Sequence, residues 1–151
     1  MTENRKADHI DLAFKSQLLN ESLDTRFYYE PLLGKHPSPK DKLETKFLGK
    51  NLNFPLWISS MTGGALKAKA INHNLAWAAS EFKIGFALGS VRPLLEDDKF
   101  FDDFNVRELI GFDRPFFANI GIAQLEELLE QNKIDRLHHV VERLKCDGII
   151  V

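Results

Sequence analysis

Short runs of apolar residues recur along the chain at nearly equal intervals, and each of the first three is followed by a stretch with helical spacing of apolar positions. The runs begin at residues 55, 85, 115 and 147 and predict buried strands over Pro55–Ser60, Gly85–Ser90, Pro115–Gly121 and Asp147–Val151. Strands that alternate with helices predict a parallel sheet covered by helices. We therefore expect a βα unit to repeat along the chain from residue 55 onward.

The intervals between these runs predict helices of different lengths. Between residues 71 and 82, apolar side chains fall at positions i, i+4, i+7 and i+11, a stripe suited to packing on a sheet. The second interval predicts a shorter helix from Phe100 to Leu109, entered through acidic residues. The third interval predicts two amphipathic helices, around residues 125–129 and 137–144.

Residues 1–54 are expected to form an amino-terminal extension before the first of these strands. A short helix is expected near its start, beginning at Asp8 or His9, with apolar positions on one side from Ile10 to Leu19. Prolines between residues 31 and 39 then predict a surface connection. Two short runs, 43–48 and 51–56, flank Gly49-Lys50 and predict a β-hairpin that leads into the first strand.

Two architectures share this rhythm of strands and helices: an open doubly wound sheet and a (β/α)8 barrel. The turn after the first strand lacks a Gly-x-Gly-x-x-Gly pattern, which disfavours an open sheet that binds a dinucleotide. The chain also ends on Ile149-Ile150-Val151, inside an expected strand. We therefore expect residues 55–151 to form the first four βα units of a (β/α)8 TIM barrel, truncated in the fourth strand.

Polar and small residues follow the strands at what would be one rim of the sheet, where α/β folds hold their ligands. The rim is expected to carry Ser59, Ser60, Met61, Thr62, Gly63, Gly89, Ser90, Arg92, Asn119 and Gly121. The Asn119 amide both donates and accepts, so it suits the N–H and C=O edge of a uracil-like ring, such as the pyrimidine part of a flavin. The backbone beside Gly63 can approach a planar ligand, and Arg92 can hold a carboxylate or phosphate.

Composition narrows the classes of function. The 151 residues carry a formal net charge of −2, which gives no sign of a nucleic-acid surface. No window approaches the roughly 18 apolar residues of a membrane helix. The single cysteine, Cys146, leaves no internal disulfide and fits a reducing compartment. We therefore expect a cytoplasmic protein with neither nucleic acid nor a membrane among its partners.

Three other groups of reactive residues are not expected to form a metal or catalytic site. The acidic residues between Glu96 and Asp103 are typical of a solvated helix entrance rather than a metal site. His138-His139 is expected to be a surface pair. Cys146 has no His–Cys–acid arrangement around it that would make it a nucleophile. No metal-binding residue is therefore assigned in this chain.

Four motifs occur in an order and spacing that resemble one enzyme family. They are Arg5-Lys6-Ala7-Asp8-His9-Ile10, Ser60-Met61-Thr62-Gly63-Gly64, Gly89-Ser90-Val91-Arg92 and Ala118-Asn119-Ile120-Gly121. On these motifs the chain resembles the amino-terminal half of the type 2 isopentenyl-diphosphate delta-isomerases, which are FMN-dependent (β/α)8 barrels that interconvert isopentenyl and dimethylallyl diphosphate. The resemblance spans the whole chain and about the first half of the family's barrel. One departure is Val91, where the family usually has a polar residue.

The resemblance implies a flavin site and a substrate site. Reduced FMN would contact Ser60, Met61, Thr62, Gly63, Ser90 and Asn119 and would serve in acid–base proton transfer without net redox change. The diphosphate of the substrate would contact Arg5, Lys6, His9, Ser90 and Arg92. NADPH would reduce the flavin and Mg²⁺ would bind the diphosphate, in a homo-oligomeric enzyme of isoprenoid biosynthesis. The family's catalytic glutamine and metal-binding glutamate come beyond Val151, so no catalytic residue is expected within this chain.

Two alternatives stay open. Another FMN-dependent TIM barrel, of the α-hydroxy-acid oxidase type, would share the flavin rim, although a small hydroxy acid would not need the cationic Arg5-Lys6 segment. A non-enzymatic half-barrel would serve as an assembly module. The inward faces of Ile58, Phe86 and Phe117 would lack opposing strands, and the edge strands would be unpaired. The chain alone is therefore expected to pair with another copy, to pair with a separate carboxyl-terminal half or to aggregate. The resemblance implies on separate grounds that it is inactive, because the family's glutamine, metal ligand and phosphate loops are absent from it.

Overall fold

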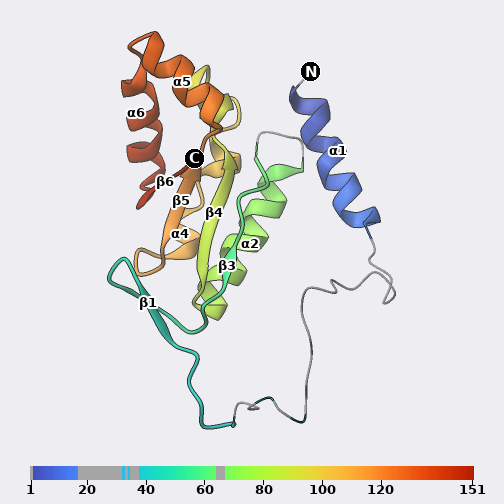
Figure 1. Ribbon diagram of the computed structural model, residues 1–151. Coiled ribbons are helices and arrows are strands. Elements are labelled where there is room, and N and C mark those ends of the chain that lie inside the picture. The colour runs from blue at the N-terminus through green and yellow to red at the C-terminus, as the bar shows by residue number, and fades with distance from the viewer. Residues whose placement is uncertain (1, 17–31, 33, 35–37, 64–66) are drawn as a thin grey trace.

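The computed structural model describes residues 2–16, 32, 34, 38–63 and 67–151 (Figure 1). Helix α1 (Thr2–Lys15) is followed by an antiparallel hairpin of β1 (Thr45–Phe47) and β2 (Lys50–Leu52). One parallel sheet then contains, in chain order, β3 (Trp57–Ile58), β4 (Gly85–Ser90), β5 (Phe116–Asn119) and β6 (Gly148–Ile150). The predicted strands are therefore confirmed, although only β4 has the expected bounds.

Helices connect the strands of this sheet. They are α2 (Ala68–Phe82), the 3-10 helix η2 (Arg92–Leu95), α3 (Phe101–Phe104), α4 (Arg107–Ile110), α5 (Ile122–Glu130) and α6 (Ile134–Leu144). The single helix expected from Phe100 to Leu109 is wrong, because the backbone leaves helical geometry at Asn105 (φ −78°, ψ 75°). That break separates α3 from α4 and lets both Phe104 and Arg107 turn into the protein. None of the described helices has the length and apolar character needed to cross a bilayer.

The core lies between one face of the sheet and the helices. The fully buried side chains include Phe86, Leu88, Phe116 and Ala118 from the strands, Ile120 directly after β5, and Ala76, Ala79, Ile110, Leu137 and Leu144 from the helices. Burial of a large apolar side chain contributes about 1.5–3 kcal/mol, so this layer is the main source of stability. A four-stranded parallel sheet occurs both in a partial barrel and in an open sheet. The (β/α)8 barrel therefore stays a prediction.

An aromatic cluster covers the amino-terminal end of the opposite face of the sheet. The ring centroid of Trp57 lies 5.4 Å from that of Phe47 and 5.3 Å from that of Phe117. The Trp57 ring occupies the space that a Cβ on Gly85 would need, at 2.0 Å from the ideal Cβ position. Gly85 is therefore required for β3 and β4 to pair under this ring, and Phe47 brings the hairpin against the sheet.

Ile58, Phe86 and Phe117 were expected to face the barrel interior, on the side of the sheet away from the helices. For two of these three side chains the expectation is wrong. Phe86 is 1% exposed in the helix-side core, and Ile58 packs against the same core. Phe117 alone of the three lies on the opposite face, in the aromatic cluster. Side chains alternate between the faces of a strand, but a near-continuous apolar run does not reveal which set faces the helices.

The hairpin and the first helix also differ in detail from expectation. Leu48 (φ 48°) and Gly49 (φ 77°) form a tight left-handed turn, so Lys50 belongs to β2 rather than to the turn. Helix α1 begins at Thr2, well before the predicted start at Asp8 or His9. Of the predicted apolar stripe, Ile10 is buried, Leu12 and Phe14 are exposed, and Leu18 and Leu19 lie outside the described residues.

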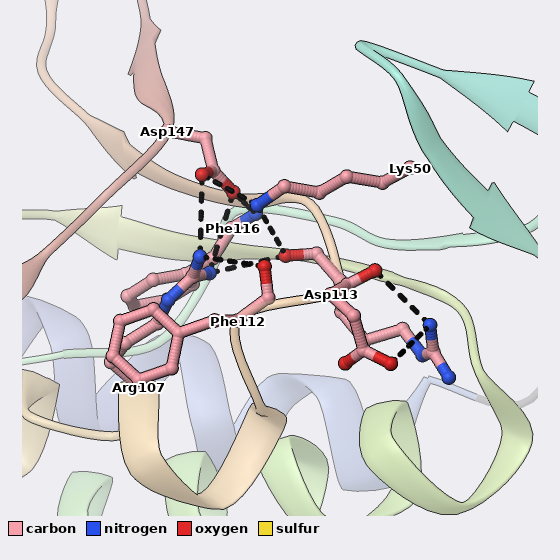
Figure 2. Close-up of polar contacts among 7 residues, drawn as sticks. Lys50, Arg107, Phe112, Asp113, Phe116 and Asp147 are labelled. Carbon is pink, nitrogen blue, oxygen red and sulfur yellow. Dashed lines mark hydrogen bonds and ion pairs between the residues drawn. The ribbon is translucent and has the colours of Figure 1, made fainter.

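A network of charges fixes the amino-terminal ends of β5 and β6 to the hairpin (Figure 2). The carboxylate of Asp147 accepts hydrogen bonds from Lys50 Nζ (2.6 Å), from both terminal nitrogens of Arg107 (3.2 and 3.3 Å) and from the Phe116 N–H (2.9 Å). Arg107 also donates to the carbonyl oxygens of Phe112 and Arg114. One carboxylate therefore joins β2, α4, β5 and the start of β6.

The guanidinium of Arg107 is the most deeply buried charged group of this network, with its side chain 3% exposed. Its central carbon lies 4.8 Å from the Phe112 ring centroid and 5.7 Å from that of Phe116, which adds cation–π contacts. A buried cation needs a paired anion and further hydrogen bonds to offset its desolvation. Asp147 supplies the anion, so this network sets the relative position of the elements that it joins.

Candidate functional site

The predicted rim begins at the loop after β3, and the structure joins this loop to β4. The N–H of Gly89 donates a hydrogen bond to the carbonyl oxygen of Thr62 (3.0 Å). A Cβ on Gly89 would lie 2.6 Å from that oxygen and 2.7 Å from the backbone of Met61. Glycine at position 89 therefore allows the loop carrying Met61 and Thr62 to lie directly against the strand.

The ends of β4 and β5 meet through a change of register. Ala87 lies opposite Phe117, but Ser90 lies opposite Asn119, so β4 has one more residue than β5 in this interval. Such a β-bulge redirects the side chains that follow it. Beyond it the Val91 N–H donates to the Asn119 carbonyl oxygen (2.8 Å), which extends the pairing. The bulge therefore brings Ser90 and Asn119 side by side at the carboxyl ends of their strands.

Asn119 has the clearest unused hydrogen-bonding capacity of the predicted site residues. Its Nδ2 donates to the carbonyl oxygen of Ile150 (3.3 Å), which fixes the orientation of the amide. Its Oδ1 has no hydrogen-bond partner among the residues that the structure describes, and the side chain is only half-buried. A ligand N–H that reached this oxygen would therefore meet an oriented acceptor.

The other rim residues differ in exposure. The side chain of Met61 is 65% exposed, whereas Ser60, Thr62 and Ser90 are half-buried. Gly63 is buried, and the ring of Phe104 occupies the place of its missing side chain, with one ring carbon 2.1 Å from the ideal Cβ position. A packing requirement thus explains this glycine, and its predicted approach to a planar ligand stays a prediction.

The residues predicted for the diphosphate are not assembled into one site by the described part of the chain. Arg92 is exposed at the start of η2 and lines a shallow groove of about 120 Å³ with Gln124, Gln131, Lys133 and Arg136. His9 is exposed on α1. The side chains of Arg5 and Lys6 lie outside the described part of the structure, which gives only their helical backbone.

Two of the acidic residues between Glu96 and Asp103 have basic partners. Asp98 accepts two hydrogen bonds from Arg143, and this guanidinium lowers the pKa of the Asp98 carboxyl. Asp102 forms an ion pair with Lys69 at 3.1 Å. Within the described ranges, no group of three or more His, Cys, Asp or Glu residues could hold a metal ion.

The histidine pair and the cysteine lie away from the rim. His138 and His139 are exposed on α6. Burial raises the pKa of the Cys146 thiol to about 12, so this group is a neutral thiol near pH 7. A neutral, half-buried thiol is a poor nucleophile.

A larger cavity, of about 560 Å³, lies at the other end of the sheet, beneath the hairpin. It is lined by Glu44, Thr45, Lys46, Asn51, Leu52, Asn53, Lys83, Asp113 and Arg114. Arg114 donates to the carbonyl oxygen of Asn51 and pairs with Asp113. No predicted site residue lines this cavity, and in parallel α/β folds ligands bind at the carboxyl ends of the strands. We therefore treat the β3–β5 rim as the candidate site.

Several curated proteins to which the chain is similar share one name. No family model matches the chain. It is 36% identical over 154 residues to an isopentenyl-diphosphate delta-isomerase of Pelodictyon phaeoclathratiforme, covering 99% of the chain and 42% of that relative. The corresponding protein of Picrophilus torridus is 36% identical over 161 residues (100% and 44%), and that of Rickettsia typhi is 34% identical over 150 residues (97% and 43%).

These relatives correct one part of the sequence interpretation. Their names read isopentenyl-diphosphate delta-isomerase and specify no type. The type 2 designation predicted from the motifs is therefore withdrawn. The chain is similar to isopentenyl-diphosphate delta-isomerases whose names give no type. It spans less than half the length of these curated relatives, and its similarity therefore concerns only part of each of them.

Proposed function

We propose that residues 1–151 form the flavin-binding part of an isopentenyl-diphosphate delta-isomerase, which interconverts isopentenyl and dimethylallyl diphosphate in isoprenoid biosynthesis. The observation that carries this proposal is the similarity of nearly the whole chain, at 34–36% identity, to proteins of that name. Relatives with this name favour the isomerase over a hydroxy-acid oxidase that would share the flavin rim. The enzyme is proposed to act as a homo-oligomer.

The donor and acceptor set at the rim fits the polar edge of a flavin ring. Asn119 Oδ1 offers an acceptor for the ring N–H, and the hydroxyls of Thr62 and Ser90 offer donors for ring carbonyls. Exposed Met61 offers a flexible apolar side chain for the ring face. We propose that these residues, with Ser60 and the backbone of Gly63, hold FMN. When bound and reduced, FMN would supply the acid–base group for proton transfer at the substrate double bond.

The chain's own part in the mechanism is to bind and orient. Asn119, held by Ile150, would fix the pyrimidine edge, and the loop of residues 60–63 would lie against the ring from β3. Arg92 is exposed and can hold a phosphate through a bidentate contact, and its own N–H donates to the Ser90 hydroxyl oxygen (3.4 Å) at the end of β4. Positioning of the diphosphate there would fix the distance between the alkene and the ring.

Arg5, Lys6 and His9 are proposed to complete the diphosphate contacts from α1, on the strength of the sequence motif. NADPH is proposed to reduce the flavin and Mg²⁺ to bind the diphosphate. Among the described residues no group of three or more His, Cys, Asp or Glu could hold a metal ion, and no residue of this chain is assigned to Mg²⁺. The catalytic groups and metal ligands are proposed to lie in the region that the relatives have beyond the matched part.

The proposal is tested by flavin affinity of the protein at its full natural length. FMN is titrated into the wild type and into Asn119→Ala, Thr62→Ala and Asn74→Ala, the last an exposed asparagine on α2 that serves as the control. Loss of one buried hydrogen bond to a ligand costs about 1–3 kcal/mol, so the first two variants should bind FMN roughly 5- to 150-fold more weakly. Wild-type affinity in both would remove these residues from the site.

A further inference from the structure

Asn72 is a buried polar residue on α2 that no predicted site includes. Its side chain is 1% exposed, and its neighbours at the same helical spacing, Ala68, Ala76 and Ala79, are apolar and buried. A buried amide is retained in such an interface only where its hydrogen-bonding groups have partners. The partners of Asn72 therefore indicate what it does.

Asn72 Nδ2 donates to two backbone carbonyl oxygens from different elements. One belongs to Thr62 in the loop after β3 (3.3 Å) and the other to Asp103 in α3 (2.7 Å). The two hydrogens of a primary amide can serve two acceptors at once. Asn72 therefore joins the candidate flavin loop to α3 from behind.

The Thr62 carbonyl oxygen is held from a second side by β4. The Gly89 N–H donates to it at 3.0 Å, so one oxygen receives donors from both α2 and β4. Both donors lie on elements packed against the core, whereas the loop itself carries half-buried and exposed side chains. The position of Thr62 is thus set by α2 and β4 together.

Further contacts keep α3 in place on the other side of Asn72. The Phe104 ring fills the space next to Gly63. Lys69 pairs with Asp102 at 3.1 Å, and His73 Nε2 lies 3.3 Å from the Asp102 carbonyl oxygen. These contacts flank Asn72 on α2 and fix the position of its second acceptor, the Asp103 carbonyl oxygen. The hydrogen bond to Asp103 therefore orients the amide that also holds Thr62.

We propose that Asn72 is a positioning residue that holds the loop of Met61, Thr62 and Gly63 in the arrangement that receives the ligand. The identity of that ligand, FMN, rests on the proposed function, whereas the role of Asn72 in holding the loop rests on the hydrogen bonds described above. Asn72 touches no ligand and acts through Thr62. Groups that orient ligand-contacting residues typically change affinity or activity by about 10- to 100-fold when removed, as known for the residues behind metal ligands.

The experiment compares Asn72→Ala, and the milder Asn72→Ser, with two controls in the full-length protein. Asn74→Ala removes an exposed amide from the same helix, and Val140→Ala destabilises the core from α6 without touching the loop. The hydrogen-exchange rate of the Gly89 amide is measured relative to that of the Phe86 amide. Phe86 lies in the same strand, β4, and its N–H donates to the Pro115 carbonyl oxygen instead of to the loop. FMN affinity is measured on the same samples, well below their melting temperatures.

The inference expects Gly89 exchange to rise relative to Phe86 in Asn72→Ala, and to a smaller extent in Asn72→Ser. FMN affinity is expected to fall about 10- to 100-fold in Asn72→Ala, while neither control changes the exchange ratio or the affinity. An Asn72→Ala protein with the exchange ratio and affinity of Val140→Ala would overturn it. If the wild type binds no FMN but the Gly89 ratio still rises, the proposed function fails and the positioning role stands.

Discussion

Ser90 and Asn119 lie opposite each other at the carboxyl ends of β4 and β5, because β4 contains one extra residue between Ala87 and Ser90. Without that residue the pairing that starts at Phe86 and Phe116 would bring Gly89, not Ser90, opposite Asn119. Both residues were predicted as flavin contacts from motifs that are 29 residues apart in the chain. The bulge is the structural feature that turns these two motifs into neighbours.

Gly89→Ala should disturb the loop that lies on β4. The added methyl group would overlap the Thr62 carbonyl oxygen at 2.6 Å and the Met61 backbone at 2.7 Å, and neither can move as a flexible side chain would. Overpacking of this kind costs about 1–3 kcal/mol of unfolding free energy. Gly121→Ala is the control, because its methyl group would meet only the end of the Gln124 side chain. Denaturant unfolding that gives equal stabilities for the two variants would contradict this prediction.

Asp147→Ala should destabilise the protein by about 2–4 kcal/mol, somewhat below the range for fully buried pairs. The substitution leaves the buried guanidinium of Arg107 without its anion and removes one of two acceptors of Lys50, which keeps the Arg114 carbonyl oxygen. The Asp147 side chain is itself 22% exposed, and water therefore compensates part of the loss. Asp102→Ala, which breaks an exposed pair with Lys69, should cost under about 1 kcal/mol. Urea unfolding of both variants measures the difference.

Cys146 should make stability fall at high pH. Burial raises the pKa of its thiol to about 12 from 9.0, so the unfolded chain loses this proton at lower pH than the folded protein. Between about pH 9 and pH 12 the thiol therefore lowers the unfolding free energy by at most about 1.4 kcal/mol per pH unit. Below pH 9 it has no effect. The measurement is the pH dependence of unfolding in wild type minus that in Cys146→Ala, and equal curves above pH 9 would count against the raised pKa.

Residues 1–151 expressed alone should self-associate and lack isomerase activity. Within the described sheet, β3 and β6 each pair with a single neighbouring strand. Large apolar side chains near these edges are exposed, among them Leu56, Met61, Ile149 and Val151. Exposed strand edges and apolar surface favour association between chains. Sedimentation velocity and an isomerase assay test this expectation, and a monodisperse, active monomer would refute it.

The alternation of strands and helices was predictable because apolar runs at 30- to 32-residue spacing leave few other arrangements. Strand β4 was bounded correctly, since small residues on each side, Gly85 and then Gly89-Ser90, enclose its apolar run. The face of each residue was not predictable from that run, and Phe86 was assigned to the wrong side. The break at Asn105 was missed because the surrounding phenylalanines also fit a helix.

The candidate site was predictable as a list of residues but not as a geometry. Motifs identified Ser90 and Asn119, while the bulge that aligns them leaves no mark in the spacing of apolar residues. Asn72 was missed because it lies inside a helical stripe, where an isolated polar residue gives no sign of its acceptors. The network of Asp147 joins residues 31 to 97 positions apart, and such distant charge pairs cannot be identified from one sequence.

The measurement that tests the central claim most directly is isomerisation of isopentenyl diphosphate by the full-length protein with and without flavin. Protein stripped of FMN is assayed in D₂O with Mg²⁺, before and after FMN and NADPH are added, and deuterium in dimethylallyl diphosphate is measured. We expect no turnover by the stripped protein and deuterium-labelled product after reconstitution, with much weaker recovery in Asn119→Ala. Full turnover without flavin, or none after reconstitution, would contradict the proposed function.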